Sequence, residues 1–158
     1  MRLSGGEDAL IGKAACLAFD VNSGWSASVI EDKKQATDLI DRALSNGSGS
    51  ATAHLVKGNI LVSGHPEEAL AEYDTAIEIK PNFHPAYSAK GIALILSGRA
   101  HEAFSPLELA LRISPRDAFA FSWHWGLCHA HLHLHEYKEA IEECRRSMNM
   151  KTRTCRLT

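Results

Sequence analysis

The sequence predicts an all-α fold built from repeated pairs of antiparallel helices. The main observation is a set of paired small residues, seven positions apart within each pair, that recurs at intervals of 33, 34 and 37 residues: Ala36 and Ala43, Ala69 and Ala76, Ala103 and Ala110, and Ala140 and Ser147. Seven residues make about two helical turns, so each pair puts two short side chains on one helix face, where another backbone can approach closely. Turns containing Gly or Pro separate the helices. We therefore expect about three to four repeats and seven to eight helices in one domain, 1–158.

The composition is that of a globular protein with an apolar core. Of the 158 residues, 45% are hydrophobic, and 17 basic against 19 acidic residues give a net charge of −2. This balance provides no electrostatic reason to expect nucleic acid or an anionic membrane as a partner. The N-terminus lacks the apolar stretch of a secretory signal. We expect a soluble, cytoplasmic protein that needs no cofactor.

The segment 84–115 is the clearest repeat. Its first helix has a stripe of residues at spacings of four and three, with a glycine where the neighbouring helix must come close: Tyr87, Gly91 and Leu94. The second helix ends at Pro115. Pro106 lies within the first two turns of this second helix and predicts either a local kink or a late helix start.

The flanking segments follow the same plan. The repeat 51–81 has Gly58 in its first helix, Pro66 as the first residue of its second helix and Pro81 as its end. Upstream, 7–45 forms a divergent helix pair in which Trp25 is expected to cover the end of the stack. Downstream, 117–150 is a repeat with a longer first helix, and 151–158 is a tail.

The last repeat contains the irregular part of the sequence. Aromatic residues and histidines alternate with smaller residues between Phe119 and His135, a pattern that by itself predicts a strand. A lone strand in a helical stack would leave its backbone without hydrogen-bond partners, so we expect a helix over 119–133. In the second helix, 137–148, four residues are expected to face inward: Ala140, Ile141, Cys144 and Met148.

The repeat pattern resembles the tetratricopeptide repeat in three features: the interval of 34 residues from Pro81 to Pro115, a small residue in the first helix, and two alanines seven positions apart in the second. This resemblance implies a right-handed superhelical stack whose concave groove is lined by the first helix of each pair. By repeat register the groove-facing candidates are Leu55, Asn59, Val62, Ser88, Ile92, Ile95, Trp125, His129 and His133. Because aliphatic residues and a tryptophan dominate, an amphipathic helix or extended peptide is the expected ligand. Relatives that clamp chaperone carboxylates use Lys, Arg and Asn here, and only Asn59 remains.

The stretches 109–117, 125–131 and 137–141 are similar to the repeat arrays that follow catalytic or DNA-binding modules in bacterial adenylate cyclases and transcription regulators. This chain contains neither module. The resemblance therefore implies a regulatory, protein-binding scaffold without enzymatic activity. The chain is expected to bind a protein or peptide, and a homodimer or a place within a larger multidomain protein is left open.

Two alternatives from other classes remain. The first is a metal-binding protein centred on the last repeat, with His124, Cys128, His131 and Cys144 as candidate ligands. The cysteines are unevenly spaced and form no CxxC pair, so free thiols are expected, and a buried Cys128 would be inert as a nucleophile. The second alternative is a self-associating array in which the groove is filled by the N-terminal helix or a twin subunit.

Overall fold

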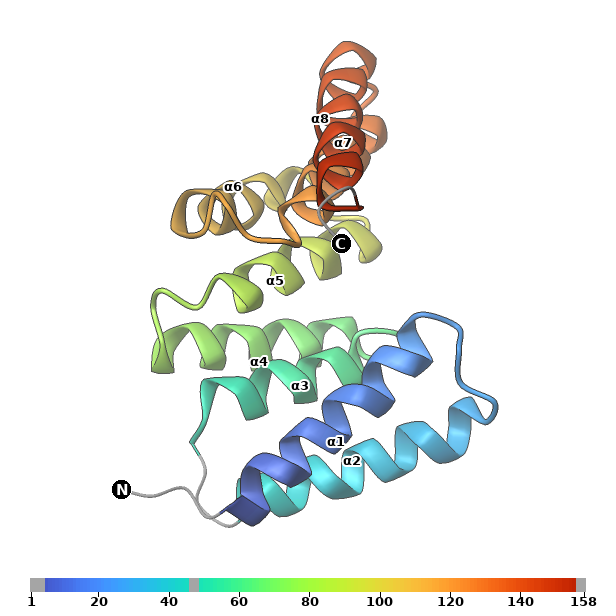
Figure 1. Ribbon diagram of the computed structural model, residues 1–158, viewed down its shortest axis with the longest axis vertical. Helices are drawn as coiled ribbons and strands as arrows, with labels where there is room; N and C mark the ends of the chain where they lie inside the picture. Colours follow the sequence, from blue (N-terminus) through green and yellow to red (C-terminus); the bar gives the residue numbers. More distant parts are fainter. Residues whose placement is uncertain (1–4, 46–48, 156–158) are drawn as a thin grey trace. The chain divides into compact units, whose positions relative to one another are not determined.

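The computed structural model describes residues 5–45 and 49–155, and all of its regular elements are helical (Figure 1). In chain order the elements are α1 (Gly5–Asn22), α2 (Val29–Ser45), α3 (Ala51–Leu61), α4 (Pro66–Ile79), α5 (His84–Leu96), the short 3₁₀ helix η1 (Ala100–Glu102), α6 (Phe104–Ile113), α7 (Ala120–His133) and α8 (Tyr137–Cys155). The all-α prediction is confirmed. Part of the segment between the first two predicted helix pairs, 46–48, and the end of the predicted tail, 156–158, lie outside the described residues.

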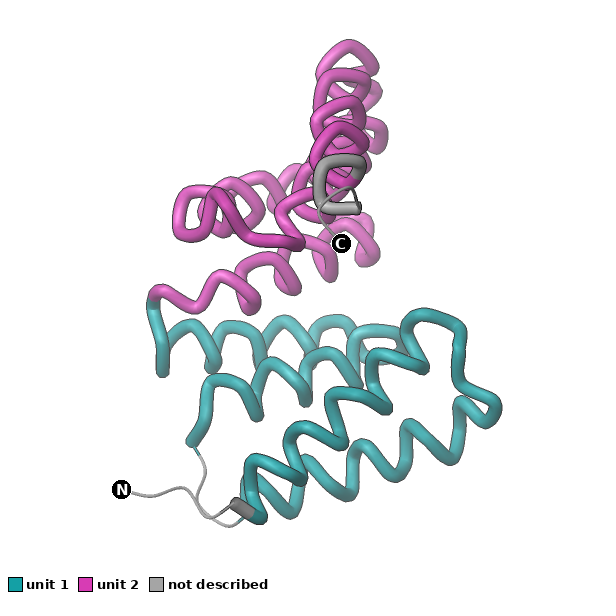
Figure 2. Tube along the Cα trace, viewed as in Figure 1, with its two compact units in different colours: residues 1–81 teal, residues 82–158 magenta. Residues whose placement is uncertain are grey.

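The chain forms two compact units, 1–81 and 82–158, each built from two helix hairpins (Figure 2). In the first unit α1 pairs with α2 and α3 with α4, while α1 and α2 both contact α3. In the second unit α5 pairs with α6 and α7 with α8, while α5 and α6 both contact α7. Successive hairpins within a unit are therefore stacked on one another, as the repeat pattern predicts.

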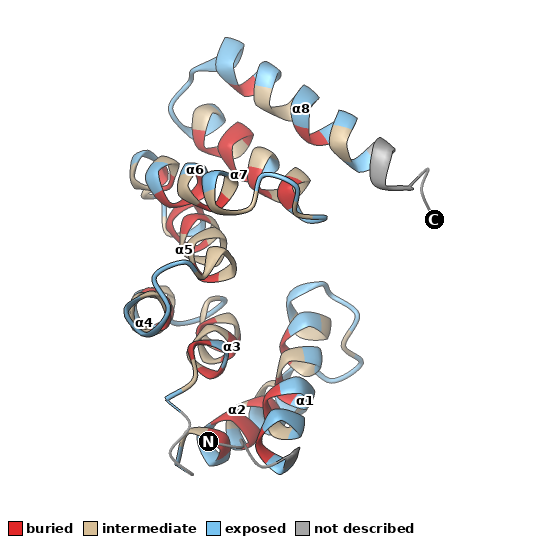
Figure 3. Cartoon of the chain, turned by 60° about the vertical axis from the view of Figure 1, so that its left-hand side comes forward, coloured by how far each residue is buried: buried red, intermediate tan, exposed pale blue. Residues whose placement is uncertain are grey.

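The small-residue pairs lie in the core of each unit. All seven alanines of the four pairs are at most 1% exposed, and Ser147 is also buried. Figure 3 shows the buried residues gathered on the inward side of the hairpins. The short side chains let the helices approach, and larger residues such as Ile40 and Leu107 fill the space between them. The prediction from spacing is thus confirmed at every pair.

Two glycines mark the closest helix approaches. A Cβ atom built on Gly58 of α3 would lie 2.3 Å from Cε1 of Tyr73 on α4, and one built on Gly91 of α5 would lie 2.5 Å from Cγ of Leu107 on α6. No carbon can occupy either place without displacing a buried side chain. Glycine is therefore required at both positions by packing, as expected from the sequence.

The helix starts show how the sequence controls the turns. Pro66 is the first residue of α4, where a missing N–H costs no helical hydrogen bond. Pro106 lies in the first turn of α6, which begins only at Phe104 after the 3₁₀ helix, so the late start applies. The segment before α7 is a turn in which the Asp117 carboxylate accepts a hydrogen bond from the Phe119 N–H at 2.8 Å. The strand alternative for this region is wrong, because α7 is helical throughout.

Three expectations about individual elements need correction. The helix α8 continues to Cys155, beyond the predicted end of the repeat. Ile141 and Met148, expected to face inward, are 52% and 61% exposed, because α8 contacts only α7 among the described elements. Trp25 is 73% exposed, so it covers little of the stack. Among the described residues, no helix is both long and apolar enough to cross a membrane.

Candidate binding surface

The predicted groove residues of the second unit lie on α5 and α7. Trp125 is 47% exposed, and the imidazole of His129 lies one turn further along α7 with its ring centroid 4.0 Å from that of the indole. His133, another turn on, is exposed. The two rings are tilted by 44° to each other. An exposed indole packed against a neighbouring ring has lost part of its rotamer freedom before any ligand binds, which favours binding.

The α5 side of this surface is less open than the sequence predicted. Ile92 is half-buried, and its Cδ1 lies 3.0 Å from the place of a Cβ on Gly126, so Ile92 packs where α5 approaches α7. Ser88 is half-buried and donates its hydroxyl to the Pro85 carbonyl at 3.0 Å. Ile95 is only 7% exposed. It belongs to the core, so its assignment to an open groove face is wrong.

In the first unit the groove candidates Leu55, Asn59 and Val62 are all half-buried. The Tyr73 hydroxyl donates to Oδ1 of Asn59 at 3.0 Å, and Nδ2 of Asn22 donates to the Asn59 backbone carbonyl at 2.9 Å. Burial also raises the pKa of the Tyr73 phenol well above its ordinary value, which keeps it neutral as a donor. Asn59 therefore joins α1, α3 and α4 and is not an open clamp residue.

The helix α1 itself lies along α3. Ile11, Ala14 and Ala18 of α1 share one apolar cluster with Val56 and Ile60 of α3. A shallow depression remains where α1, α2 and α3 meet, and it has no enclosed volume large enough for water. This part of the first unit offers a ligand little space.

The histidine run forms hydrogen bonds that hold the last hairpin. Nδ1 of His124 lies 2.6 Å from Oε2 of Glu143 on α8, and both side chains are largely buried. Nδ1 of His131 lies 2.7 Å from Oε2 of Glu136 in the turn after α7. Two of the four predicted metal ligands thus have carboxylate partners, one in α8 and one in the turn between α7 and α8.

The other two predicted ligands are bonded to each other. Cys128 of α7 and Cys144 of α8 form a disulfide with their Cα atoms 5.3 Å apart. The expectation of free thiols is wrong for this pair, and neither sulfur is available to a metal ion. Among the described residues, no group of three or more His, Cys, Asp or Glu side chains is arranged to hold one. Cys16 is a free, exposed thiol.

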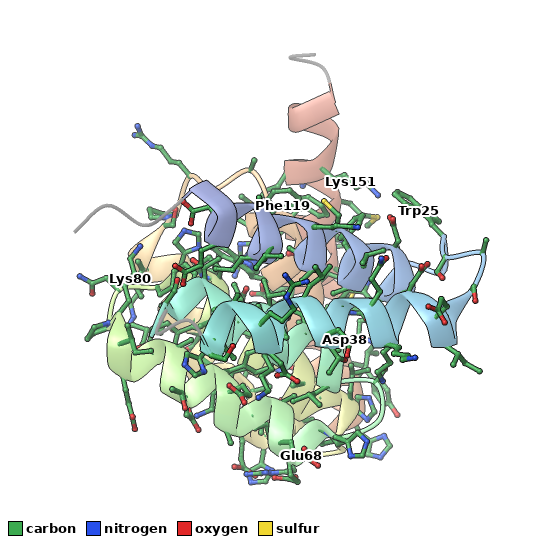
Figure 4. All side chains as sticks on the ribbon, turned by 90° about the horizontal axis from the view of Figure 1, so that it is seen from below. Trp25, Asp38, Glu68, Lys80, Phe119 and Lys151 are labelled. Carbon is green, nitrogen blue, oxygen red and sulfur yellow. A yellow bond between two sulfur atoms is a disulfide. The ribbon has the colours of Figure 1, made fainter. Side chains whose placement is uncertain are left out.

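The sequence reasoning missed two exposed apolar patches. Trp25, labelled in Figure 4, lies in the turn between α1 and α2. Phe19 packs edge-on against it with ring centroids 5.6 Å apart, and Val29 and Ile30, a few residues further along the chain, are exposed. On α8, Tyr137, Ile141 and Met148 recur at helical spacing and are exposed. The sequence signal for the first patch is that Val29 and Ile30, the first two residues of α2, are both apolar. The homodimer stays a prediction.

This chain has the tetratricopeptide-type helical-repeat fold. That fold consists of stacked antiparallel hairpins, with alanine pairs that recur at an interval of 34 residues and a glycine of the first helix that packs against a large side chain of the second. No protein-family model and no curated protein matches the chain. The comparison with solved structures is therefore what supports the assignment.

Three solved structures illustrate the likeness. YrrB, described as a TPR protein with an unusual peptide-binding site, is 24% identical with a TM-score of 0.65 over 78% of this chain and 63% of its own. PilF of Pseudomonas aeruginosa is 19% identical with a TM-score of 0.75 over 93% of this chain and 64% of its own. A MamA structure is 15% identical with a TM-score of 0.68 over 96% and 87%.

These identities establish the fold alone. The chain spans less than two thirds of YrrB and of PilF, with 63% and 64% of their lengths covered. The more specific resemblance to the arrays of adenylate cyclases and transcription regulators is not supported by these structures and stays a prediction.

Proposed function

We propose that this chain is a protein-interaction scaffold with a regulatory rather than a catalytic role, and that the α5–α7 face of the second unit binds an apolar segment of a partner protein. The observation that carries the proposal is Trp125, an exposed indole in contact with the tilted ring of His129. Tryptophan is the residue type most enriched among energetically dominant interface residues. YrrB, which has the same fold, is described as having a peptide-binding site.

The chemistry of this face favours an apolar ligand. Besides Trp125, the residues proposed for this face are Ile92, Ser88, His129 and His133, and none of the nine predicted groove residues is a lysine, arginine, aspartate or glutamate. Such a surface lacks the lysine and arginine side chains that usually bind a phosphate or a free carboxylate. It fits an amphipathic helix or an extended strand with one large apolar side chain placed against the indole.

A peptide selection followed by one substitution tests this proposal. A phage-displayed library of random peptides is selected on the purified chain, and the affinity of each enriched peptide is measured by fluorescence anisotropy. We expect enrichment of peptides with spaced apolar residues. We also expect Trp125→Ala to weaken their binding by about thirtyfold, equivalent to about 2 kcal/mol, while the helical circular dichroism stays unchanged.

The matched control is Trp25→Ala. Trp25 is also an exposed tryptophan with one aromatic neighbour, but it lies in the first unit. The control should leave peptide affinity unchanged. The proposal is contradicted if no peptide is enriched, if Trp125→Ala binds as tightly as the unaltered chain, or if Trp25→Ala rather than Trp125→Ala loses binding.

A further inference from the structure

The α7–α8 hairpin differs from the two hairpins before it in the pair of residues that joins its two helices. In α3–α4 a glycine faces Tyr73, and in α5–α6 a glycine faces Leu107, with the large side chain in direct contact in each case. Tyr73, Leu107 and Cys144 each lie four residues after the first alanine of their small-residue pair. Cys144 therefore occupies the position of the large side chain, and it faces Cys128 through a disulfide.

The first helix shows the same correspondence. Gly91 precedes Ala103 by twelve residues, and Cys128 precedes Ala140 by twelve residues. Cys128 is 1% exposed, so it fills the place that packing reserves for a small residue. A covalent bond thus stands where the other hairpins have an apolar contact.

Among the described elements, α8 packs against a single helix. It contacts only α7, whereas α6 contacts both α5 and α7. Its α7-facing side consists of small and polar residues: Ala140 and Ser147 are buried, Glu143 pairs with His124, and the Ser147 hydroxyl donates to the Phe121 carbonyl at 2.7 Å. No large apolar side chain of α8 is buried in the described part of this hairpin, since Ile141 and Met148 are exposed.

We propose that the Cys128–Cys144 disulfide is a reversible thiol–disulfide exchange site, at which a small thiol such as glutathione releases α8 from α7. The inference concerns the last hairpin only and stands independently of the proposed peptide-binding face. In the oxidised chain the disulfide fastens α8, and in the reduced chain α8 opens from α7 more often.

The exchange proceeds in two balanced steps. A small thiolate attacks Sγ of Cys144, which is half-buried, while Sγ of Cys128 is shielded in the core. A mixed disulfide forms at Cys144, the bond to Cys128 breaks, and Cys128 leaves as a thiolate that takes a proton from solvent. A second small thiolate then attacks the sulfur of the small thiol in the mixed disulfide, so that Cys144 is released as a thiol and the small disulfide leaves. Two electrons pass from the two small thiols to the protein, and oxidised glutathione reverses the sequence.

The size of the effect depends on the loop that the disulfide closes. The two cysteines are 16 residues apart. A cross-link across a loop of about this length shifts an opening equilibrium by on the order of a hundredfold, because it restricts the open state. Two thiols do not replace this restraint, since together they lack the apolar surface of a Gly–Leu or Gly–Tyr pair.

The test is hydrogen exchange of the chain in reduced and oxidised glutathione buffers. Cys16→Ser and Cys155→Ser are introduced first, which leaves Cys128 and Cys144 as the only cysteines. Alkylation and mass spectrometry establish the thiol state. We expect disulfide formation in the oxidised buffer, and about hundredfold faster amide exchange in α8 after reduction. Exchange in α1 should not change.

A second variant keeps the test independent of any general loss of stability. Cys128→Gly with Cys144→Leu rebuilds the Gly–Leu pair of α5–α6, and we expect its α8 exchange to be slow and equal in both buffers. The proposal is overturned if the disulfide does not form in the oxidised buffer or if α8 exchange is unchanged by reduction. Faster exchange in α1 together with α8, or a redox response in the Gly–Leu variant, would overturn it as well.

Discussion

Gly91→Ala tests whether close helix packing, rather than helix propensity, requires the glycine in the second unit. The added methyl carbon would lie 2.5 Å from Cγ and 2.8 Å from Cδ2 of Leu107. Leu107 is fully buried, and its Cδ1 already lies 3.1 Å from the place of a Cβ on Gly126. The leucine therefore has glycine backbone on two sides and cannot move away without losing packing there.

The expected magnitude is a balance of two effects. Overpacking a filled core costs about 1–3 kcal/mol. Replacing Gly by Ala in a helix stabilises it by about 0.5–1 kcal/mol. Because the clash involves the branching carbon Cγ of a buried leucine and not only the methyl groups at its tip, we expect the first effect to dominate, with a net loss of about 1 kcal/mol.

Urea unfolding provides the assay, followed by circular dichroism and by the fluorescence of Trp123, which is buried in the same unit. The matched control is Gly12→Ala, because Gly12 lies in the middle of α1 with nothing within 4 Å of a built Cβ. The control should gain about 0.5–1 kcal/mol from helix propensity alone. The opposite signs of the two alanine substitutions are the expected result.

A double-mutant cycle isolates the contact itself. Leu107→Ala alone should cost about 2–5 kcal/mol, because it leaves a cavity. Combined with Gly91→Ala it should cost less than the sum by at least about 0.5 kcal/mol, because the new methyl group then has room. The packing argument is refuted if Gly91→Ala stabilises as Gly12→Ala does, or if the two substitutions are additive.

Two further substitutions test individual side chains. Burial raises the pKa of Tyr73 above its ordinary value of 10.0. The neutral phenol therefore contributes its full share of stability below about pH 10. This contribution falls as the pH rises further, because the phenol ionises first in the unfolded chain. Tyr73→Phe should lower the unfolding free energy by about 1 kcal/mol at neutral pH through loss of the bond to Asn59, and should weaken the alkaline decline in urea titrations; an unchanged decline contradicts the assignment. Asp117→Ala removes the acceptor of the Phe119 N–H and the carboxylate that lies 3.6 Å from Nε2 of His84, and should lower the unfolding free energy of the second unit by about 1 kcal/mol in the same assay. Asp117→Asn keeps an acceptor oxygen and should retain most of this free energy, and equal losses in both variants would count against the hydrogen bond to the Phe119 N–H as its source.

The helix pairs were predictable because their signals are local. The spacing of seven between Ala103 and Ala110 depends only on helical geometry, and both residues are buried as expected. Pro106 illustrates the limit of such signals. It predicts a disturbance within two turns, but whether the helix kinks or starts late depends on the preceding residues, which here form the 3₁₀ helix.

The faces of the helices were harder to predict than their ends. Ile92 and Ile95 of α5 are three residues apart, and only Ile92 is half-buried rather than buried. Three residues turn a helix by about 300°, so the two side chains point about 60° apart around its axis, which is enough to separate a core position from one at its edge. Ile141 and Met148 were expected inside because the repeat pattern assumes a following helix. In the described part of the chain no element covers them, so the pattern predicts their spacing but not their burial.

The disulfide was missed because cysteine spacing along the chain was considered without the hairpin geometry. Within one repeat, the register that places Gly91 against Leu107 also places Cys128 against Cys144, and this correspondence is visible in the sequence once the hairpin is accepted. The three extra residues of the 37-residue interval do not disturb it, since Cys128 and Ala140 keep the twelve-residue spacing of Gly91 and Ala103. The three extra residues must therefore lie before α7, in the turn in which the Asp117 carboxylate accepts a hydrogen bond from the Phe119 N–H. The irregular segment shifts the start of the last repeat by three residues but leaves the spacing within the repeat unchanged. Trp125 and the Cys128–Cys144 disulfide therefore lie on a hairpin with the regular helix spacing.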